Sequence, residues 1–367
     1  MKTAYTSIEP FGTPHFQITW ESTLKCNLDC SYCSPNDHNN KIPHPTLEDC
    51  LKTVDFFLEY TDVYMQYKNP EQRNVGFNVF GGESFFHPNI IEILIYIKEQ
   101  HKKYQDKWTM TVQTVTNAVV KEKIWQKALP LIDYYTVSYH SEATQDQQAL
   151  LKENLLVLKK HNKRFVCSIL MHAGYWDNCQ SMIAWCKQHD IPYLPRQLDH
   201  SWHDFKYFYD SDQTKWWDNE RGVNSKVPLY KKIINIVNLD SQGRSCCGSN
   251  PLSVNGDTSC SQTYIPGNNF KGWSCSVNYF FVYVKQVTKE IFLNKDCQMN
   301  FDGRVAPIGT IDDHKEIIKQ LQTNLKNGTM PVVVCNKSKC WCGLCAPKAH
   351  NRETFDSMMK KYVADSV

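Results

Sequence analysis

An alternation of strand-like and helix-like segments between residues 16 and 200 constrains the fold of this chain more than any other feature. Six segments have the apolar and aromatic content of buried strands: 16–20, Val75–Phe80, Thr109–Thr116, Tyr134–Tyr139, Phe165–Met171 and Pro192–Leu198. Helical patterns lie between them, at 46–60, 89–103, 121–129, 145–160 and 178–189. Repeated βα units imply parallel strands with right-handed crossovers. We therefore expect an α/β fold, a partial (β/α)6 barrel of the TIM type.

Three cysteines follow the first of these strands in a short polar loop. Cys26, Cys30 and Cys33 have the spacing CxxxCxxC. Three thiols can ligate three corners of a cubane iron–sulfur cluster and leave the fourth iron open to a small molecule. In barrels of this type the chemistry lies at the C-terminal ends of the strands, where this loop begins. The alternatives are unrelated thiols or part of a zinc site, although zinc motifs more often pair one CxxC with another.

The chain has sixteen cysteines in 367 residues, and nine of them lie between 246 and 345. No apolar run could span a bilayer, and the N-terminus lacks the apolar stretch of a signal peptide. We therefore expect a cytoplasmic protein without a membrane partner, in which disulfides do not persist. A second metal region is the simplest explanation of these nine cysteines, and the four between the two regions are expected to pack as buried thiols. The net charge is +3, and Lys and Arg are scattered along the sequence, so there is no basic patch that would indicate binding of nucleic acid.

The predicted organisation has three parts: a barrel at 1–200, an aromatic-rich bridge at 201–240 and a cysteine-rich α+β domain at 241–367. In the last part, Tyr279–Val284 and Glu290–Leu293 have the pattern of a hairpin, and Cys275 and Cys297 flank it. A helix is expected to follow, with Asp312 as its N-cap and Gly328 at its end.

The first 200 residues resemble the radical S-adenosylmethionine (radical SAM) enzymes. The resemblance rests on CxxxCxxC with an aromatic residue, Tyr32, before its last cysteine, and on Gly81-Gly82-Glu83 directly after the second strand. It implies a 4Fe–4S cluster on Cys26, Cys30 and Cys33 that binds S-adenosylmethionine (AdoMet) and reductively cleaves it. The products would be methionine and a 5′-deoxyadenosyl radical that abstracts hydrogen from a substrate.

The same resemblance implies the cofactor-binding residues, and Tyr32 of the cysteine motif is one of them. The turn Gly81-Gly82-Glu83 would hold the methionine end, since glycines let a backbone edge approach a ligand and a carboxylate can accept a hydrogen bond from an ammonium group. Asn117 and Ser138, near the ends of the third and fourth strands, match positions that often contact the ribose or carboxylate. The alternative for Gly81-Gly82-Glu83 is a strand-ending turn. The alternative for Asn117 and Ser138 is that they are ordinary polar residues at strand ends. His140 could face the site, although a structural histidine is the alternative there.

The cysteine-rich part resembles the auxiliary-cluster extensions called SPASM and twitch. The twitch arrangement would place one auxiliary 4Fe–4S cluster on Cys275, Cys297, Cys342 and Cys345. The spacing of the final cysteines departs from the longer SPASM pattern. Five further cysteines could ligate a second cluster, hold zinc or be buried thiols: Cys246, Cys247, Cys260, Cys335 and Cys340.

The resemblance implies an oxidoreductase or maturase that takes its electron from an external flavodoxin- or ferredoxin-type donor. We expect a peptide or protein substrate, with a small sugar or alcohol as the alternative. Only about fifteen residues precede the first strand, so a leader-binding domain is expected to be absent or supplied by a partner. A non-catalytic iron–sulfur or zinc protein is the alternative of another class; it would explain the cysteines but not Gly81-Gly82-Glu83.

Overall fold

The structure is a computed structural model. It describes residues 7–8, 15–33, 37–68, 70–198, 209–220, 270–298, 306–336, 346–360 and 362.

A curved, mostly parallel sheet forms the centre of the described part of the chain. Its six consecutive parallel strands are β2 (Phe16–Glu21), β3 (Asn74–Phe80), β4 (Thr109–Thr116), β5 (Tyr134–Tyr139), β6 (Arg164–Met171) and β7 (Tyr193–Gln197). The sheet is open, because β7 lies at one edge and β11 (Gly309–Thr310) at the other. The expected α/β partial barrel is confirmed.

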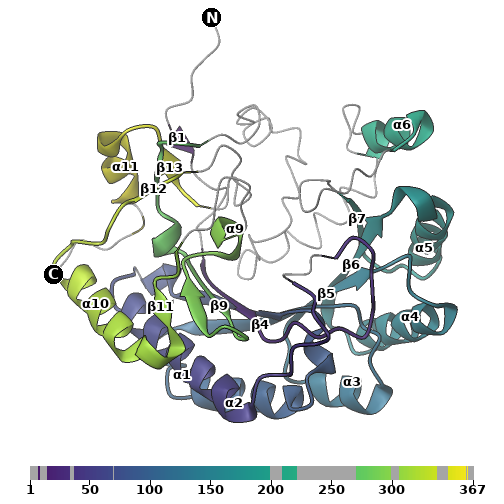
Figure 1. Ribbon diagram of the computed structural model, residues 1–367, viewed down its shortest axis with the longest axis horizontal. Helices are drawn as coiled ribbons and strands as arrows, with labels where there is room; N and C mark the ends of the chain where they lie inside the picture. Colours follow the sequence, from purple (N-terminus) through teal and green to yellow (C-terminus); the bar gives the residue numbers. More distant parts are fainter. Residues whose placement is uncertain are drawn as a thin grey trace, which may run out of the picture.

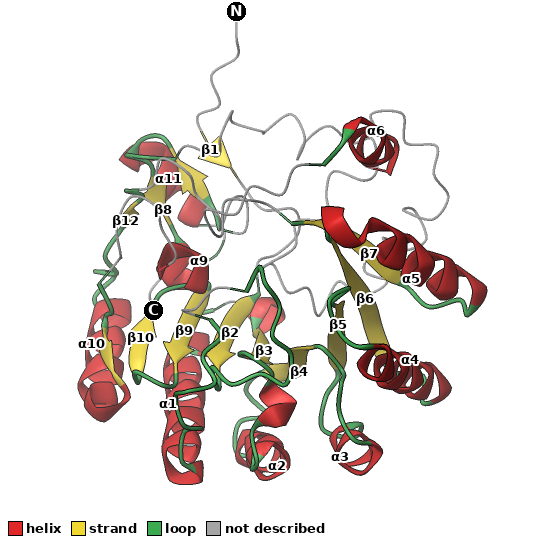
Figure 2. Cartoon of the chain, turned by 45° about the vertical axis from the view of Figure 1, so that its right-hand side comes forward, coloured by secondary structure: helices red, strands yellow, loops and turns green. Residues whose placement is uncertain are grey.

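Helices cover the outer face of this sheet (Figures 1 and 2). They are α1 (Leu47–Met65), α2 (Ile90–His101), α3 (Glu122–Ala128), α4 (Gln145–Lys160) and α5 (Trp176–Gln188). Alternate strand residues such as Tyr135, Val137 and Tyr139 are buried in the core beneath the helices, as the period of a strand requires. Their neighbours, including Thr136 and Ser138, lie on the opposite face of the sheet and are half-buried.

The cysteine-rich part of the chain adds strands to the same sheet. The hairpin of β9 (Phe281–Lys285) and β10 (Glu290–Phe292) confirms the expected one. Strand β9 pairs in parallel with β2, and β11 pairs with β10. The short helix α9 (Lys295–Gln298) follows β10. The proposed division of the chain into 1–200, 201–240 and 241–367 stays a prediction.

A second, smaller sheet joins the two ends of the chain. Its strands, in spatial order, are β1 (Ser7–Ile8), β13 (Lys348–Ala349), β8 (Ser274–Cys275) and β12 (Val333–Val334). Helix α11 (Arg352–Met359) contacts β13 and β8. Residues Phe270, Phe280 and Phe355 belong to the apolar core of this unit.

One helix boundary differs from the prediction. Helix α10 (His314–Lys326) begins two residues after Asp312, which lies in the 3-10 turn Ile311–Asp313. Asp312 is therefore not the N-cap; its carboxylate instead faces the Lys289 ammonium group at 3.9 Å. The predicted end is confirmed, since Gly328 follows the helix with a φ of +63° that favours glycine. In the aromatic-rich region the structure describes α6 (Ser211–Glu220), where Trp216 and Trp217 lie.

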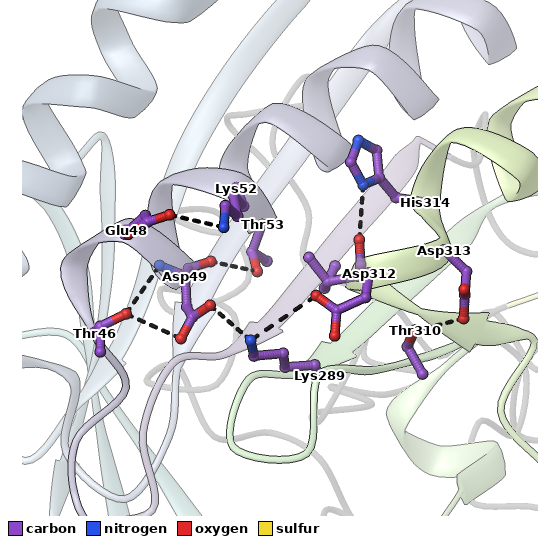
Figure 3. A network of polar contacts seen from close by, with 11 residues as sticks. Thr46, Glu48, Asp49, Lys52, Thr53, Lys289, Thr310, Asp312, Asp313 and His314 are labelled. Carbon is purple, nitrogen blue, oxygen red and sulfur yellow. Dashed lines mark hydrogen bonds and ion pairs between the residues drawn. The ribbon is translucent and has the colours of Figure 1, made fainter.

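A polar network connects the β9–β10 turn with the first turn of α1 and with the 3-10 turn before α10 (Figure 3). The Lys289 ammonium group is 2.7 Å from the Asp49 carboxylate. The Thr46 side chain caps α1 by accepting a hydrogen bond from the backbone N–H of Asp49. This network links an element of the C-terminal half to the barrel. Among the residues described, no helix has the length and apolar content needed to cross a bilayer.

Candidate functional site

The loop that contains the three cysteines lies at the C-terminal ends of adjacent parallel strands. It follows β2, and the neighbouring strands β3, β4 and β5 end beside it. Asn117 after β4 and Glu142 after β5 contact the loop through their side chains, and Gly82 after β3 contacts the backbone that leads into it. The sequence pattern therefore placed the loop at the correct edge of the sheet.

The Gly81-Gly82 turn pairs with the backbone that leads into the cysteine loop. The Gly82 N–H donates to the Thr23 carbonyl at 2.8 Å, and the Glu83 N–H donates to the Lys25 carbonyl at 2.8 Å. A Cβ atom on Gly81 would lie 2.4 Å from the Thr23 carbonyl oxygen, and one on Gly82 would lie 2.4 Å from that of Lys25. Two glycines are needed here because the backbone of this turn lies against the backbone of Thr23 and Lys25. Their contact with a ligand stays a prediction.

Glu83 connects the ends of β3 and β4. Its side chain is 1% exposed. The carboxylate accepts hydrogen bonds from the Phe85 N–H (3.0 Å), the Thr116 hydroxyl (2.9 Å) and the Asn117 N–H (2.6 Å). Burial raises its pKa to about 7, and the hydrogen bonds from Asn117, Phe85 and Thr116 oppose that shift. Since a carboxylate has about four acceptor positions, these three donors leave little capacity for a ligand ammonium group.

Asn117 contacts the first cysteine of the loop. Its side-chain amide nitrogen lies 3.6 Å from the Cys26 sulfur and 2.7 Å from the side-chain oxygen of Asn27. The Asn27 amide in turn donates to the Val119 carbonyl at 2.7 Å. Asn117 thus fixes the start of the loop against the end of β4, while Glu83 holds the Asn117 backbone.

A carboxylate after β5 holds the centre of the loop. Glu142 accepts from the Ser31 N–H at 2.7 Å and from the Ser31 hydroxyl at 2.6 Å. The Nε2 atom of His172 lies 3.6 Å from the same carboxylate. The sequence pattern did not predict Glu142 or His172 as site residues. The signal for Glu142 was its position just past the end of a strand, which is the same signal that marked Asn117.

Tyr32 and His140 lie against the second cysteine. The His140 Nδ1 atom is 2.6 Å from the Tyr32 hydroxyl and 3.4 Å from the Cys30 sulfur. The two rings stack, with centroids 5.9 Å apart. Burial lowers the pKa of His140 to about 4, so the ring is neutral near pH 7. His140 therefore faces the cysteine loop.

Three neighbouring thiols of the loop could together ligate an iron–sulfur cluster. Burial raises the pKa of the Cys26 and Cys30 thiols to about 12 and that of Cys33 to about 11. The three thiols lie within electrostatic range of one another. In the part of the chain described, no three His, Cys, Asp or Glu side chains converge on a single metal ion. An iron–sulfur cluster spreads its ligands over several irons, and cationic iron would stabilise the thiolates that burial disfavours.

A cavity of about 360 Å³ borders the loop. One side is formed by Cys26–Cys30, and the other includes Glu142, Thr144 and Gln147. Thr144 and Gln147 form the capping box that begins α4. The Gln147 amide also donates to the Asn27 carbonyl at 3.3 Å, so the helix start is joined to the loop. The volume lies in the range of small-molecule sites.

The remaining predicted site residues lie elsewhere or outside the described residues. Ser138 lies on the half-buried inner face of β5, opposite Ser168 of β6. Cys275 is buried in the apolar core of the smaller sheet, and Cys297 packs against that core. Cys335 is buried in the same core. Six cysteines lie outside the described residues: Cys246, Cys247, Cys260, Cys340, Cys342 and Cys345.

Comparison with solved structures reveals similar folds. A structure of native anSMEcpe with bound AdoMet has a TM-score of 0.50 and 14% identity, over 81% of this chain and 78% of that one. A second, with AdoMet and the Cp18Cys peptide, has a TM-score of 0.50 and 13% identity, over 83% and 80%. A histidine-tagged form with AdoMet gives 0.50 and 13%, over 84% and 77%. The chain shares their fold. No protein-family model and no curated protein sequence matches it.

Proposed function

We propose that the chain is a radical SAM enzyme. The observation that carries this proposal is the loop of Cys26, Cys30 and Cys33, which lies at the C-terminal edge of a parallel sheet whose fold resembles AdoMet-bound structures. A 4Fe–4S cluster held by the three thiols would supply one electron to AdoMet, giving methionine and a 5′-deoxyadenosyl radical.

The residues around the loop would orient this group rather than react. Asn117 donates toward the Cys26 sulfur, and Glu142 holds the Ser31 backbone. Gly81 and Gly82 allow the loop backbone to lie close to the end of β3. The methionine end of AdoMet would then lie against this turn, and Ser138 on the inner face of β5 is a proposed contact for the nucleoside end. Glu83 would support the turn through its three protein donors.

A peptide is the proposed substrate class. The support is a similar structure that contains both AdoMet and a peptide. The proposed reaction is abstraction of a substrate hydrogen by the 5′-deoxyadenosyl radical, which becomes 5′-deoxyadenosine. The proposal includes at least one auxiliary 4Fe–4S cluster, with Cys275 and Cys297 among its ligands, and an external flavodoxin- or ferredoxin-type reductant.

The substrate class is tested by adding a cysteine-containing peptide and a sugar alcohol separately. Faster 5′-deoxyadenosine formation with the peptide alone is expected. Stimulation by the sugar alcohol alone would contradict the peptide assignment.

Cluster binding is tested by anaerobic reconstitution with iron and sulfide. We expect an electron paramagnetic resonance (EPR) signal of the reduced protein that changes when AdoMet is added. Alanine at Cys26, Cys30 or Cys33 should remove the AdoMet-dependent signal. The control is Cys50→Ala, which removes a buried thiol of α1 outside the loop and should keep the signal. Stoichiometric zinc with no AdoMet-dependent signal would instead favour the zinc alternative.

A further inference from the structure

Two side chains that can donate protons converge on one cysteine of the loop. The Tyr32 hydroxyl lies within electrostatic range of the Cys30 sulfur. The His140 Nδ1 atom lies 3.4 Å from the same sulfur and 2.6 Å from the Tyr32 oxygen. The three atoms therefore form a closed set of contacts, in which His140 is more than one hundred positions from the other two residues in the sequence.

Ligation of iron decides which atoms carry the protons in this set. An iron-bound thiolate has no proton, so the Cys30 sulfur can only accept hydrogen bonds. The Tyr32 hydroxyl has one proton and can direct it to the sulfur. Nδ1 of His140 then faces lone pairs of the Cys30 sulfur and of the Tyr32 oxygen. This contact is favourable only if Nδ1 also carries a proton. Thus the thiolate selects the tautomer in which His140 donates from Nδ1.

The rings that bear these donors are held in place by packing. Tyr32 is 9% exposed. It stacks on His140, and the His172 ring contacts it with centroids 5.9 Å apart. The backbone N–H of Gly174 donates to His172 Nδ1 at 3.0 Å, which leaves the His172 proton on Nε2, toward Glu142. Glu142 in turn binds Ser31, the residue beside Tyr32. The donor pair is therefore fixed relative to the loop.

We propose that Tyr32 and His140 form a hydrogen-bond pair that sets the reduction potential of a cluster ligated by Cys30. The inference rests on the proposed function, because it requires that cluster. Reduction adds negative charge to a cluster, and hydrogen bonds to its ligand sulfurs stabilise the added charge. Removal of either donor therefore makes the cluster harder to reduce. Both residues act as positioning residues, through the electronic state of the sulfur.

The experiment measures the midpoint potential of the full-length reconstituted protein by an EPR-monitored redox titration. The titration follows the signal that responds to AdoMet, so an auxiliary cluster does not interfere. Tyr32→Phe removes one oxygen atom and keeps the ring. We expect the ratio of reduced to oxidised cluster at a fixed potential to fall about tenfold, which is a shift of about 59 mV for a one-electron couple. His140→Leu should shift the potential in the same direction, and His140→Gln, which keeps an N–H donor, should restore part of it.

The matched control is Tyr175→Phe. Tyr175 packs on the His172 ring, with ring centroids 5.0 Å apart, and is 43% exposed. Loss of its hydroxyl should leave the potential unchanged. Two results would overturn this inference and leave the proposed function intact. One is that Tyr32→Phe and His140→Leu keep the AdoMet-responsive cluster and its wild-type potential. The other is that Tyr32→Phe loses the cluster. A wild-type protein that assembles no AdoMet-responsive cluster would overturn the proposed function, and this inference with it.

Discussion

The side-chain amide of Asn117 lies 3.6 Å from the sulfur of Cys26, across 91 positions of sequence. The end of β4 thereby supports the cysteine loop that follows β2. Partners that orient a metal ligand typically change metal affinity by about 10- to 100-fold when they are removed. The relationship makes Asn117 a support of the proposed cluster site, whether or not it also touches AdoMet.

Substitution Asn117→Ala is expected to weaken retention of the cluster. The Cys26 sulfur and the side-chain oxygen of Asn27 would each lose the Asn117 amide as a donor. We expect iron release to a chelator to accelerate about tenfold relative to the wild type. The control is Asn89→Ala, because Asn89 precedes α2 without a side-chain capping bond. Equal release rates in wild type and Asn117→Ala would contradict the supporting role.

The carboxyl group of Glu83 should make stability depend on pH. Burial raises its pKa in the folded state to about 7, whereas the unfolded chain titrates near the usual value of 4.5. Between these values the folded state binds more protons, so the free energy of unfolding falls as pH rises. The expected decrease is about 3 kcal/mol across the interval between the two pKa values.

Denaturant unfolding of the wild type and Glu83→Gln at several pH values checks this expectation. The amide does not titrate, so the difference in free energy between the two proteins should change across this range and level off above the folded-state pKa. A difference that is constant with pH would mean that folding leaves the pKa of Glu83 unchanged. The comparison cancels the contributions of the other titrating groups, since both proteins share them.

Much of the fold follows from the sequence, because buried parallel strands and their covering helices have local patterns. All six barrel strands lie within one or two residues of their predicted positions. The pairing of β9 with β2 had no such signal, since it joins segments about 260 residues apart. The sequence predicts the position of α10, but the prediction of Asp312 as its N-cap is wrong, because a 3-10 turn precedes the helix.

The candidate site was predictable in outline only. Residue types and spacing identified the cysteine loop and the turn after β3. They could not identify Glu142 or the contact of His140 with Cys30, because these depend on how neighbouring strand ends approach one another. The sequence predicts Glu83 as an acceptor for a ligand ammonium group. In the structure its carboxylate binds three protein donors, and a pattern of residues cannot specify such partners.

Substitution Gly82→Ala should disturb the cysteine loop. The added methyl group would lie 2.4 Å from the Lys25 carbonyl oxygen, which is backbone and cannot rotate away. We expect loss of most of the AdoMet-responsive cluster. Gly328→Ala is the control: its methyl group meets nothing within 4 Å, and it should cost about 1 kcal/mol for the positive φ alone. Full cluster content in Gly82→Ala would show that the close backbone approach is not needed.

Substitution Lys289→Met should weaken the contact between the C-terminal hairpin and α1. The Lys289 ammonium group lies 2.7 Å from the Asp49 carboxylate, and both side chains are partly buried. We expect the free energy of unfolding at pH 7 to fall by about 1 kcal/mol. Lys52→Met is the control, because the Lys52–Glu48 pair is exposed on one helix and should contribute less.

The pH dependence of this pair has a definite sign. The hydrogen bond with Lys289 lowers the pKa of Asp49, so the stabilisation is present above the unfolded value of 3.8 and is lost as pH falls through the folded value. The same bond raises the pKa of Lys289, so the stabilisation is lost again at strongly alkaline pH. The difference between wild type and Lys289→Met should therefore disappear in strong acid. Its persistence there would contradict the ion pair.

Formation of 5′-deoxyadenosine tests the central claim most directly. The reconstituted protein is incubated anaerobically with AdoMet and dithionite, and methionine and 5′-deoxyadenosine are quantified. The wild type should form both products in equal amounts, and the variant with alanine at Cys26, Cys30 and Cys33 should form neither. Equal product formation by that variant, or intact AdoMet with a wild type that contains its full cluster, would contradict the assignment.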